Sequence, residues 1–133
     1  MPSASQSRPT LAPWLTVREP ARALEFYKSA FGATETYSIP GAVYRFAIGD
    51  SEFWIGDESP EHFNFSPPAL NGSTVRLILT VTDPDAVFSQ ACAAGARVVY
   101  PITEAHGWRL GRIVDPFGHH WEIGRELSAE PHA

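Results

Sequence analysis

Apolar and polar residues along the chain predict two strand–helix units of the same design. Each unit begins with a short apolar, β-branched stretch that ends at an acidic residue followed by proline, at residues 15–20 and again at 79–84. An acidic N-cap with proline at the first helical position is a typical helix start. Apolar residues then recur at helical spacing until Gly32 or Gly95, where a left-handed residue is expected to end the helix.

Each predicted helix is followed by a strand and then by a hairpin. The strands are "TETYSI" at residues 34–39 and "RVVYPI" at 97–102, and the hairpins cover residues 42–58 and 107–126. The tripeptide "LTV" recurs 64 residues apart, and "FWIG" in the first hairpin matches "WEIG" in the second 68 residues later. The sequence therefore predicts an α+β fold of two tandem βαβββ modules forming a curved mixed sheet around a cavity.

The repeat also sets the predicted domain organisation. One domain covers residues 11–126, with modules at about 11–58 and about 74–126 and a Pro/Ser/Asn-rich linker at about 59–73. Residues 1–10 and 127–133 are expected to be flexible tails.

Composition narrows the classes of function. The net charge of −5 and the absence of a basic cluster argue against nucleic acid as a partner. No stretch approaches the ~20 apolar residues of a membrane span, and the polar N-terminus lacks the apolar segment of a signal peptide. We therefore expect a cytoplasmic protein. The single cysteine, Cys92, excludes a disulfide framework.

The repeat also selects candidate site residues, because equivalent positions of two facing modules converge on one cavity. Strand alternation and the two offsets place Ala12, Arg76, Trp54 and Glu122 in quasi-symmetric positions.

The phrases "LTVREPARALEFYKSAFGA" and "GRIVDPFGHHWEIG" resemble the vicinal oxygen chelate superfamily, which includes glyoxalase I, fosfomycin-resistance proteins, extradiol dioxygenases and bleomycin-resistance proteins. The resemblance covers residues 11–126, and the two segments are most similar in sequence to the PhnB-like, glyoxalase/bleomycin resistance branch. It implies the doubled βαβββ fold. In the enzymes of this superfamily, His, Gln or Glu residues hold a divalent metal at positions that fall on Ala12, Trp54, Arg76 and Glu122.

Among these four residues, only Glu122 matches a metal ligand. Alanine has no donor atom, the tryptophan ring offers no lone pair, and the arginine cation repels a metal. A catalytic divalent ion needs about three protein ligands. No cofactor is therefore expected, and Zn, Ni, Mn or Fe is disfavoured. His120 shares a strand face with Glu122, so these two residues are the weak candidates for a metal site.

Two charged residues and one histidine carry the candidate chemistry. Arg76 and Glu122 are expected either to pair across the cavity or to leave Arg76 facing an anionic group of a ligand. His106 lies in a loop before Trp108 and is a candidate general base with Glu122, although a solvent-exposed loop histidine is the commoner outcome. His119 is expected to support the turn at residues 115–118.

Aromatic side chains are expected to supply the rest of the cavity. The ligand-binding candidates are Trp14, Tyr44, Trp54 and Trp108, and the alternative for several of them is packing in the core. Phe63 and Phe65 in the linker would form a lid over the cavity or attach the loop to the domain.

Three functions follow from these residues. The favoured hypothesis is metal-independent binding of a small aromatic or anionic molecule. The alternatives are a metal-dependent glyoxalase-type lyase, isomerase or dioxygenase with other ligands, and a metal-free acid–base enzyme that uses Glu122 or His106. The resemblance also implies a homodimer, with the cavity either within one chain or shared between two.

Overall fold

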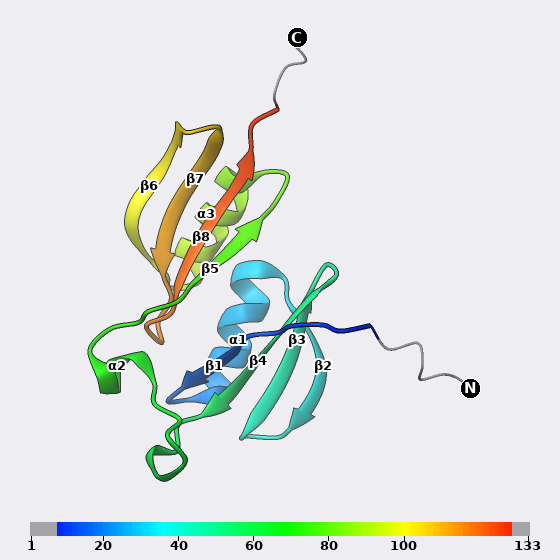
Figure 1. Ribbon diagram of the computed structural model, residues 1–133, viewed down its shortest axis with the longest axis vertical. Coiled ribbons are helices and arrows are strands. Elements are labelled where there is room, and N and C mark those ends of the chain that lie inside the picture. The colour runs from blue at the N-terminus through cyan, green and yellow to red at the C-terminus, as the bar shows by residue number, and fades with distance from the viewer. Residues whose placement is uncertain (1–7, 129–133) are drawn as a thin grey trace.

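The computed structural model describes residues 8–128 and contains two βαβββ modules, one above the other in Figure 1. Much of both predicted tails, residues 1–7 and 129–133, lies outside the described residues. The first module consists of β1 (Trp14–Val17), α1 (Pro20–Phe31), β2 (Thr34–Ile39), β3 (Val43–Ile48) and β4 (Ser51–Asp57). The second consists of β5 (Arg76–Thr80), α3 (Pro84–Ala94), β6 (Arg97–Ala105), β7 (Trp108–Val114) and β8 (His120–Glu126).

Each module forms its own four-stranded mixed sheet. The strand orders are β1-β4-β3-β2 and β5-β8-β7-β6, with one parallel pair at β1/β4 or β5/β8 and antiparallel pairs elsewhere. The prediction of two tandem βαβββ modules is confirmed. Within residues 8–128 no strand pairing joins the two sheets, so the curved sheet is divided between the modules. The linker between them contains the short helices η2 (Pro60–His62) and α2 (Pro67–Leu70).

The helix boundaries follow the predicted start and stop signals. Asp83 caps α3 by accepting the Ala86 N–H at 3.2 Å, whereas the Glu19 side chain makes no such bond at α1 and lies 3.4 Å from Arg22. Gly32 and Gly95 follow the helices at φ 66° and 125°, which other residues rarely adopt. No helix within residues 8–128 combines the length and the apolar composition needed to cross a membrane.

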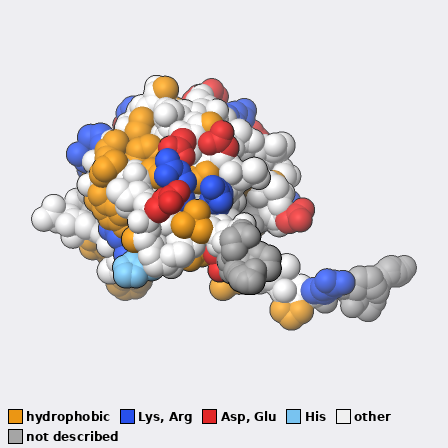
Figure 2. All heavy atoms as spheres, turned by 90° about the horizontal axis from the view of Figure 1, so that it is seen from above, with side chains coloured by type: hydrophobic (Ala, Val, Ile, Leu, Met, Phe, Trp, Pro, Cys, Tyr) orange, Lys and Arg blue, Asp and Glu red, His pale blue; other side chains and the backbone are white. Residues whose placement is uncertain are grey.

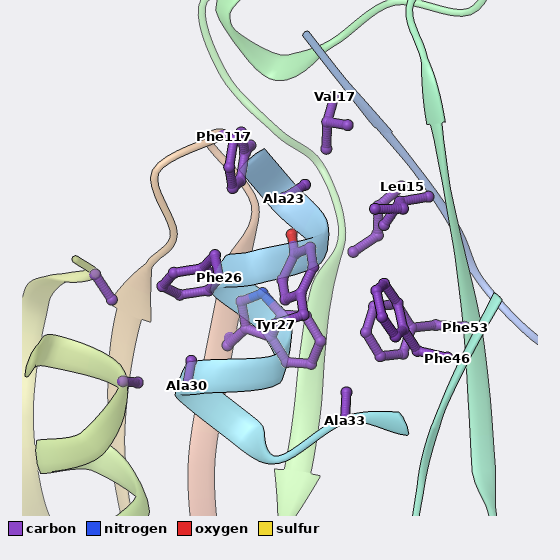
Figure 3. Packing of buried hydrophobic residues seen from close by; sticks show 14 of the residues in the cluster. Leu15, Val17, Ala23, Phe26, Tyr27, Ala30, Ala33, Phe46, Phe53 and Phe117 are labelled. Carbon is purple, nitrogen blue, oxygen red and sulfur yellow. The ribbon is translucent and has the colours of Figure 1, made fainter. Parts of the chain in front are cut away.

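One hydrophobic core joins the two modules. Tyr27 of α1 is fully buried, and its ring centroid lies 5.3 Å from that of Phe53 on β4 and 5.7 Å from that of Trp121 on β8. Figure 3 shows Tyr27 between Phe26 and the Phe46–Phe53 pair. Since the residues facing this core come from both sheets, each sheet has an inner face that packs on the core and an outer face that points away from it.

A buried carboxylate lies where the modules meet. Asp115, only 4% exposed, opens the turn between β7 and β8. Its Oδ2 accepts the Tyr27 hydroxyl and the Trp121 indole N–H, the latter at 2.9 Å. Its Oδ1 accepts the backbone N–H groups of Phe117 at 2.9 Å and His119 at 3.0 Å. These four donors offset the cost of burying a charged group.

His119 makes a second connection between the modules. Its Nε2–H donates to the backbone carbonyl of Thr16 on β1, 2.8 Å away, while its backbone N–H is bonded to Asp115. The side chain of His119 therefore connects the turn to the other module, and its contribution to the turn itself comes from its backbone N–H.

We expect Tyr27→Phe to lower the free energy of unfolding by about 1–3 kcal/mol at neutral pH, because Asp115 loses one donor in a dry core. Burial, and then the charge of Asp115, raises the pKa of Tyr27 above its ordinary value. The unfolded chain therefore loses this proton first, and the wild-type free energy of unfolding should fall as pH rises above about 10.

Urea denaturation of the wild type and the variant from neutral to alkaline pH measures both effects. The variant should lack the Tyr27 part of the alkaline decline. Tyr44→Phe is the control, because Tyr44 is also a buried tyrosine but its hydroxyl accepts the Gly41 N–H instead of bonding Asp115. An alkaline decline of the same size with and without the Tyr27 hydroxyl would contradict the prediction.

Candidate functional site

A row of large side chains crosses the outer face of the first sheet. The strand register aligns one residue from each strand: Trp14, Trp54, Arg45 and Tyr37. The neighbours Leu15 and Ile55 are buried because side chains alternate between the faces of a strand. Trp14 is 46% exposed and Tyr37 48%, so this row, here named the aromatic row, presents open ring surface to solvent.

The side chains of the aromatic row contact one another. The rings of Trp14 and Trp54 are stacked, with centroids 6.1 Å apart and planes inclined by 17°. The guanidinium carbon of Arg45 lies 5.3 Å from the Trp54 centroid and 5.9 Å from that of Tyr37, within cation–π range. Gly56 makes room for the Trp14 ring, since a Cβ on residue 56 would come within 2.1 Å of it.

The outer face of the second sheet carries the equivalent row with different chemistry. The register aligns Ile78, Glu122, Arg112 and Tyr100. Ile78 and Glu122 occupy the repeat positions of Trp14 and Trp54. The arginine–tyrosine pair is retained, with the Arg112 guanidinium carbon 5.3 Å from the Tyr100 centroid. One module therefore offers an aromatic surface and the other an ionic one.

Four side chains form an ionic group on this second face, here named the Glu122 cluster: Glu122, Arg76, Arg112 and Tyr100. The Glu122 side chain is 10% exposed, and its Oε2 accepts Arg112 Nη2–H at 3.1 Å and the Tyr100 hydroxyl at 3.2 Å. Arg76 Nη1 lies 3.5 Å from the same oxygen. Arg76 and Glu122 therefore form an ion pair, but they lie on the adjacent strands β5 and β8 of one sheet and not across a cavity between the modules, as was predicted. The sequence analysis did not predict Arg112 and Tyr100 as members of this site. The repeat offered a signal for them, because they are equivalent to Arg45 and Tyr37 of the first module.

His120 lies beside this cluster, paired in register with Arg76. Its Nδ1 is buried without a hydrogen-bond partner among the described residues. Burial, followed by the positive charge of Arg112, lowers the pKa of His120. The imidazole is accordingly neutral at neutral pH and adds no charge to the cluster.

The residues at the four inherited positions do not fit a divalent metal. Within residues 8–128 no three His, Cys, Asp or Glu side chains lie close enough together to hold one. The single carboxylate of the set, Glu122, is already in contact with two guanidinium groups, which would repel a cation at the same oxygen.

The other predicted site residues lie elsewhere. Tyr44 is buried on the inner face. His106 is exposed in the β6–β7 turn at φ 55°, next to the pair formed by Trp108 and Glu126. Glu126 is four residues along β8 from Glu122, about 13 Å at the usual strand rise. The structure therefore brings neither Tyr44 nor His106 to the two rows, and Trp108 lies at the far end of the second sheet.

A cleft of about 880 Å³ is lined by residues of both modules, beside the core that joins them. It is lined by residues 10–13, 48–53 and 77–82 together with Trp121. Of the four inherited positions only Ala12 reaches it, and from the two rows only Ile78 does. The cleft is therefore distinct from the aromatic row and the Glu122 cluster, where the candidate chemistry lies.

Comparison with known proteins agrees with this architecture. Residues 14–124 match the model of the family described as a glyoxalase-like domain. An uncharacterized protein of Mycobacterium bovis, Mb0911c, is 38% identical over 130 residues, covering 90% of this chain and 84% of its own length.

Two solved structures show the same fold. The X-ray structure of the Arabidopsis thaliana At5g48480 gene product has a TM-score of 0.70 and 32% identity, covering 87% of this chain and 98% of that one. A glyoxalase/bleomycin resistance protein/dioxygenase from Nocardioides has a TM-score of 0.69 and 24% identity, covering 92% and 87% of the respective chains.

We expect Gly56→Ala to displace the Trp14 ring from its stack on Trp54, because the new methyl group would overlap the ring. Overpacking of this kind costs about 1–3 kcal/mol of stability. Near-ultraviolet circular dichroism should show the loss of the coupled tryptophan signal, with Trp14→Ala as the reference for complete loss. A wild-type spectrum for Gly56→Ala would contradict the described position of Trp14.

Proposed function

We propose that the chain, which belongs to the glyoxalase-like domain family, binds a small aromatic or anionic organic molecule without a metal ion. The observation that carries the proposal is the stacked pair Trp14–Trp54, in which Trp14 is 46% exposed and Trp54 occupies a position that the superfamily's enzymes use for a metal ligand. We further propose that nucleic acid is not a partner, because the chain is acidic, and that the protein acts in the cytoplasm away from membranes.

The aromatic row is suited to stacking against a planar ligand. Along the row Trp54 lies between Trp14 and Arg45 on the flanking strands and contacts both, so its ring is oriented before any ligand arrives. Aromatic pairs contribute about 0.5–1.5 kcal/mol beyond the burial of apolar area. A prepared surface also avoids the cost of ordering side chains on binding.

We also propose that a second copy of the chain covers the outer faces. Large apolar side chains are exposed there on both sheets: Trp14, Tyr37, Ile39, Ile78 and Tyr100. Figure 2 shows hydrophobic side chains gathered along one side of the molecule, next to mixed acidic and basic ones. Exposed apolar surface of this extent is typical of an interaction site.

The arrangement of the modules supports a second copy of the chain as the molecule that covers these outer faces. The inner faces of both sheets are used by the shared core, so the aromatic row and the Glu122 cluster of one chain point away from it. A cavity with an aromatic wall and an ionic wall therefore forms when the first sheet of one copy faces the second sheet of another. Such an arrangement supports a homodimer with two equivalent cavities.

We expect planar aromatic probes such as 2-naphthoate and 2-naphthamide to quench the tryptophan fluorescence of the purified protein, with the same affinity before and after treatment with EDTA. Trp54→Ala should weaken binding by about tenfold or more, which corresponds to about 1.4 kcal/mol. Leu70→Ala is the control, because Leu70 is an exposed apolar residue in the linker. Near-stoichiometric Zn, Ni, Mn or Fe in the protein, or loss of binding after EDTA, would show that the proposal is wrong.

The shared cavity predicts complementation between two defective variants. Trp54→Ala removes the aromatic wall and Arg76→Gln weakens the ionic wall, so each variant alone should bind 2-naphthoate poorly. A mixed dimer has one cavity with both substitutions and one with neither, and mixing the two variants should therefore restore part of the tight binding. Sedimentation provides the dimer mass. Absence of any recovery in mixtures that contain mixed dimers would rule out a shared cavity.

A further inference from the structure

We propose that the Glu122 cluster is a binding site for one negative charge, in which Arg76 contacts the anion and Glu122 is a positioning residue. The inference rests on the proposed function and gives its ligand a class, namely a planar aromatic molecule that carries a single acidic group. The position that holds a cation in the superfamily's enzymes thereby becomes a position for an anion.

The two arginines of the cluster have different surroundings. Arg112 is 19% exposed in its side chain, directs Nε and Nη2 to Glu122 at 3.3 and 3.1 Å, and lies over the Tyr100 ring. The Arg112 guanidinium is therefore held in place by both Glu122 and Tyr100. Arg76 is 56% exposed and approaches Glu122 through Nη1 at 3.5 Å, so its exposed guanidinium keeps N–H groups available for a ligand. Arg76 is the residue that meets the anion.

The charges of the cluster do not balance. Among residues 8–128, Glu122 is the one carboxylate in contact with the two guanidinium groups of Arg76 and Arg112. His120 beside them is neutral. Two cations and one anion leave one unit of positive charge on a face that the second copy shields from water. A charge removed from water without compensation is costly, so an anionic ligand group stabilises the closed cavity.

The hydrogen bonds of Glu122 favour a positioning role over that of a base. Arg112, Tyr100 and Arg76 all converge on its Oε2. That oxygen is therefore occupied by partners from the protein. Glu122 instead orients the guanidinium planes, and a planar guanidinium can bind a carboxylate through two parallel N–H bonds.

Three probes of one shape but different charge test the inference: 2-naphthamide is neutral, 2-naphthoate carries one negative charge and 2-naphthyl phosphate carries two at mildly alkaline pH. Calorimetric titration at low ionic strength should show 2-naphthoate binding at least about tenfold more tightly than 2-naphthamide, the size expected of one charge-assisted contact. Arg76→Gln should abolish this preference without changing the affinity for 2-naphthamide.

Glu122→Gln separates positioning from a merely structural role. It raises the surplus from one to two positive charges and should move the preference from 2-naphthoate towards 2-naphthyl phosphate. Arg18→Gln is the matched control for Arg76→Gln, because Arg18 is 52% exposed and also paired with a glutamate, Glu58. Thermal unfolding confirms that each variant is folded. Since Arg76 is exposed, its variant keeps the test decisive if Glu122→Gln fails to fold.

The outcomes separate this inference from the proposed function. If 2-naphthamide binds as tightly as 2-naphthoate, or if Arg76→Gln leaves their ratio unchanged, the anion site is wrong while the aromatic binding function stands. If none of the three probes binds, the proposed function fails and the anion site fails with it.

Discussion

The arrangement of the two modules depends on one buried carboxylate. Asp115 accepts hydrogen bonds from Tyr27 of the first module and from three donors of the second. Because an unpaired buried charge is costly, the turn before β8 and helix α1 have to stay together for all four donors to be used. That constraint gives both sheets a common core at their inner faces. It thereby leaves the outer faces exposed, and these are the surfaces on which we propose that a ligand and a second copy bind.

The outer faces show how a duplicated module acquires two kinds of chemistry. Both rows retain an arginine over a tyrosine, Arg45 over Tyr37 and Arg112 over Tyr100. The residues on the parallel strand pair differ, with stacked tryptophans in the first module and Ile78 with Glu122 in the second. Gly56 leaves space for the Trp14 ring, but the second module also has a glycine at the equivalent position, Gly124, so the difference arises from the side chains of the parallel strand pair themselves. The same backbone therefore presents a stacking surface once and a charged surface once.

The sequence predicted the fold well because its signals are local or repeated. The helix boundaries, the turn at Asp115 and the two modules depend on caps, glycines and matched hairpins. It predicted the outer faces less well. Tyr37 and Tyr100 reach them because β2 and β6 each contain an irregularity that shifts the register just before the tyrosine, and simple alternation counted from the strand start assigns these residues to the wrong face. Tyr44 shows the converse problem, since alternation alone does not reveal which face of a strand packs on the core.

The separation between core and outer faces explains how the fold keeps its stability while its site changes. The buried cluster is built from inner-face residues such as Leu15, Ile55 and Ile123, and the neighbours Trp14, Trp54 and Glu122 point the other way. A substitution on the outer face therefore removes little buried apolar area and leaves the Asp115 network intact. The energetic cost of such a change falls on the outer face alone. There Glu122 is paired with Arg76 and Arg112, and in the proposed site an anion offsets the remaining positive charge of the two arginines. A metal site can accordingly be replaced by an anion site without any change in the packing of the two modules.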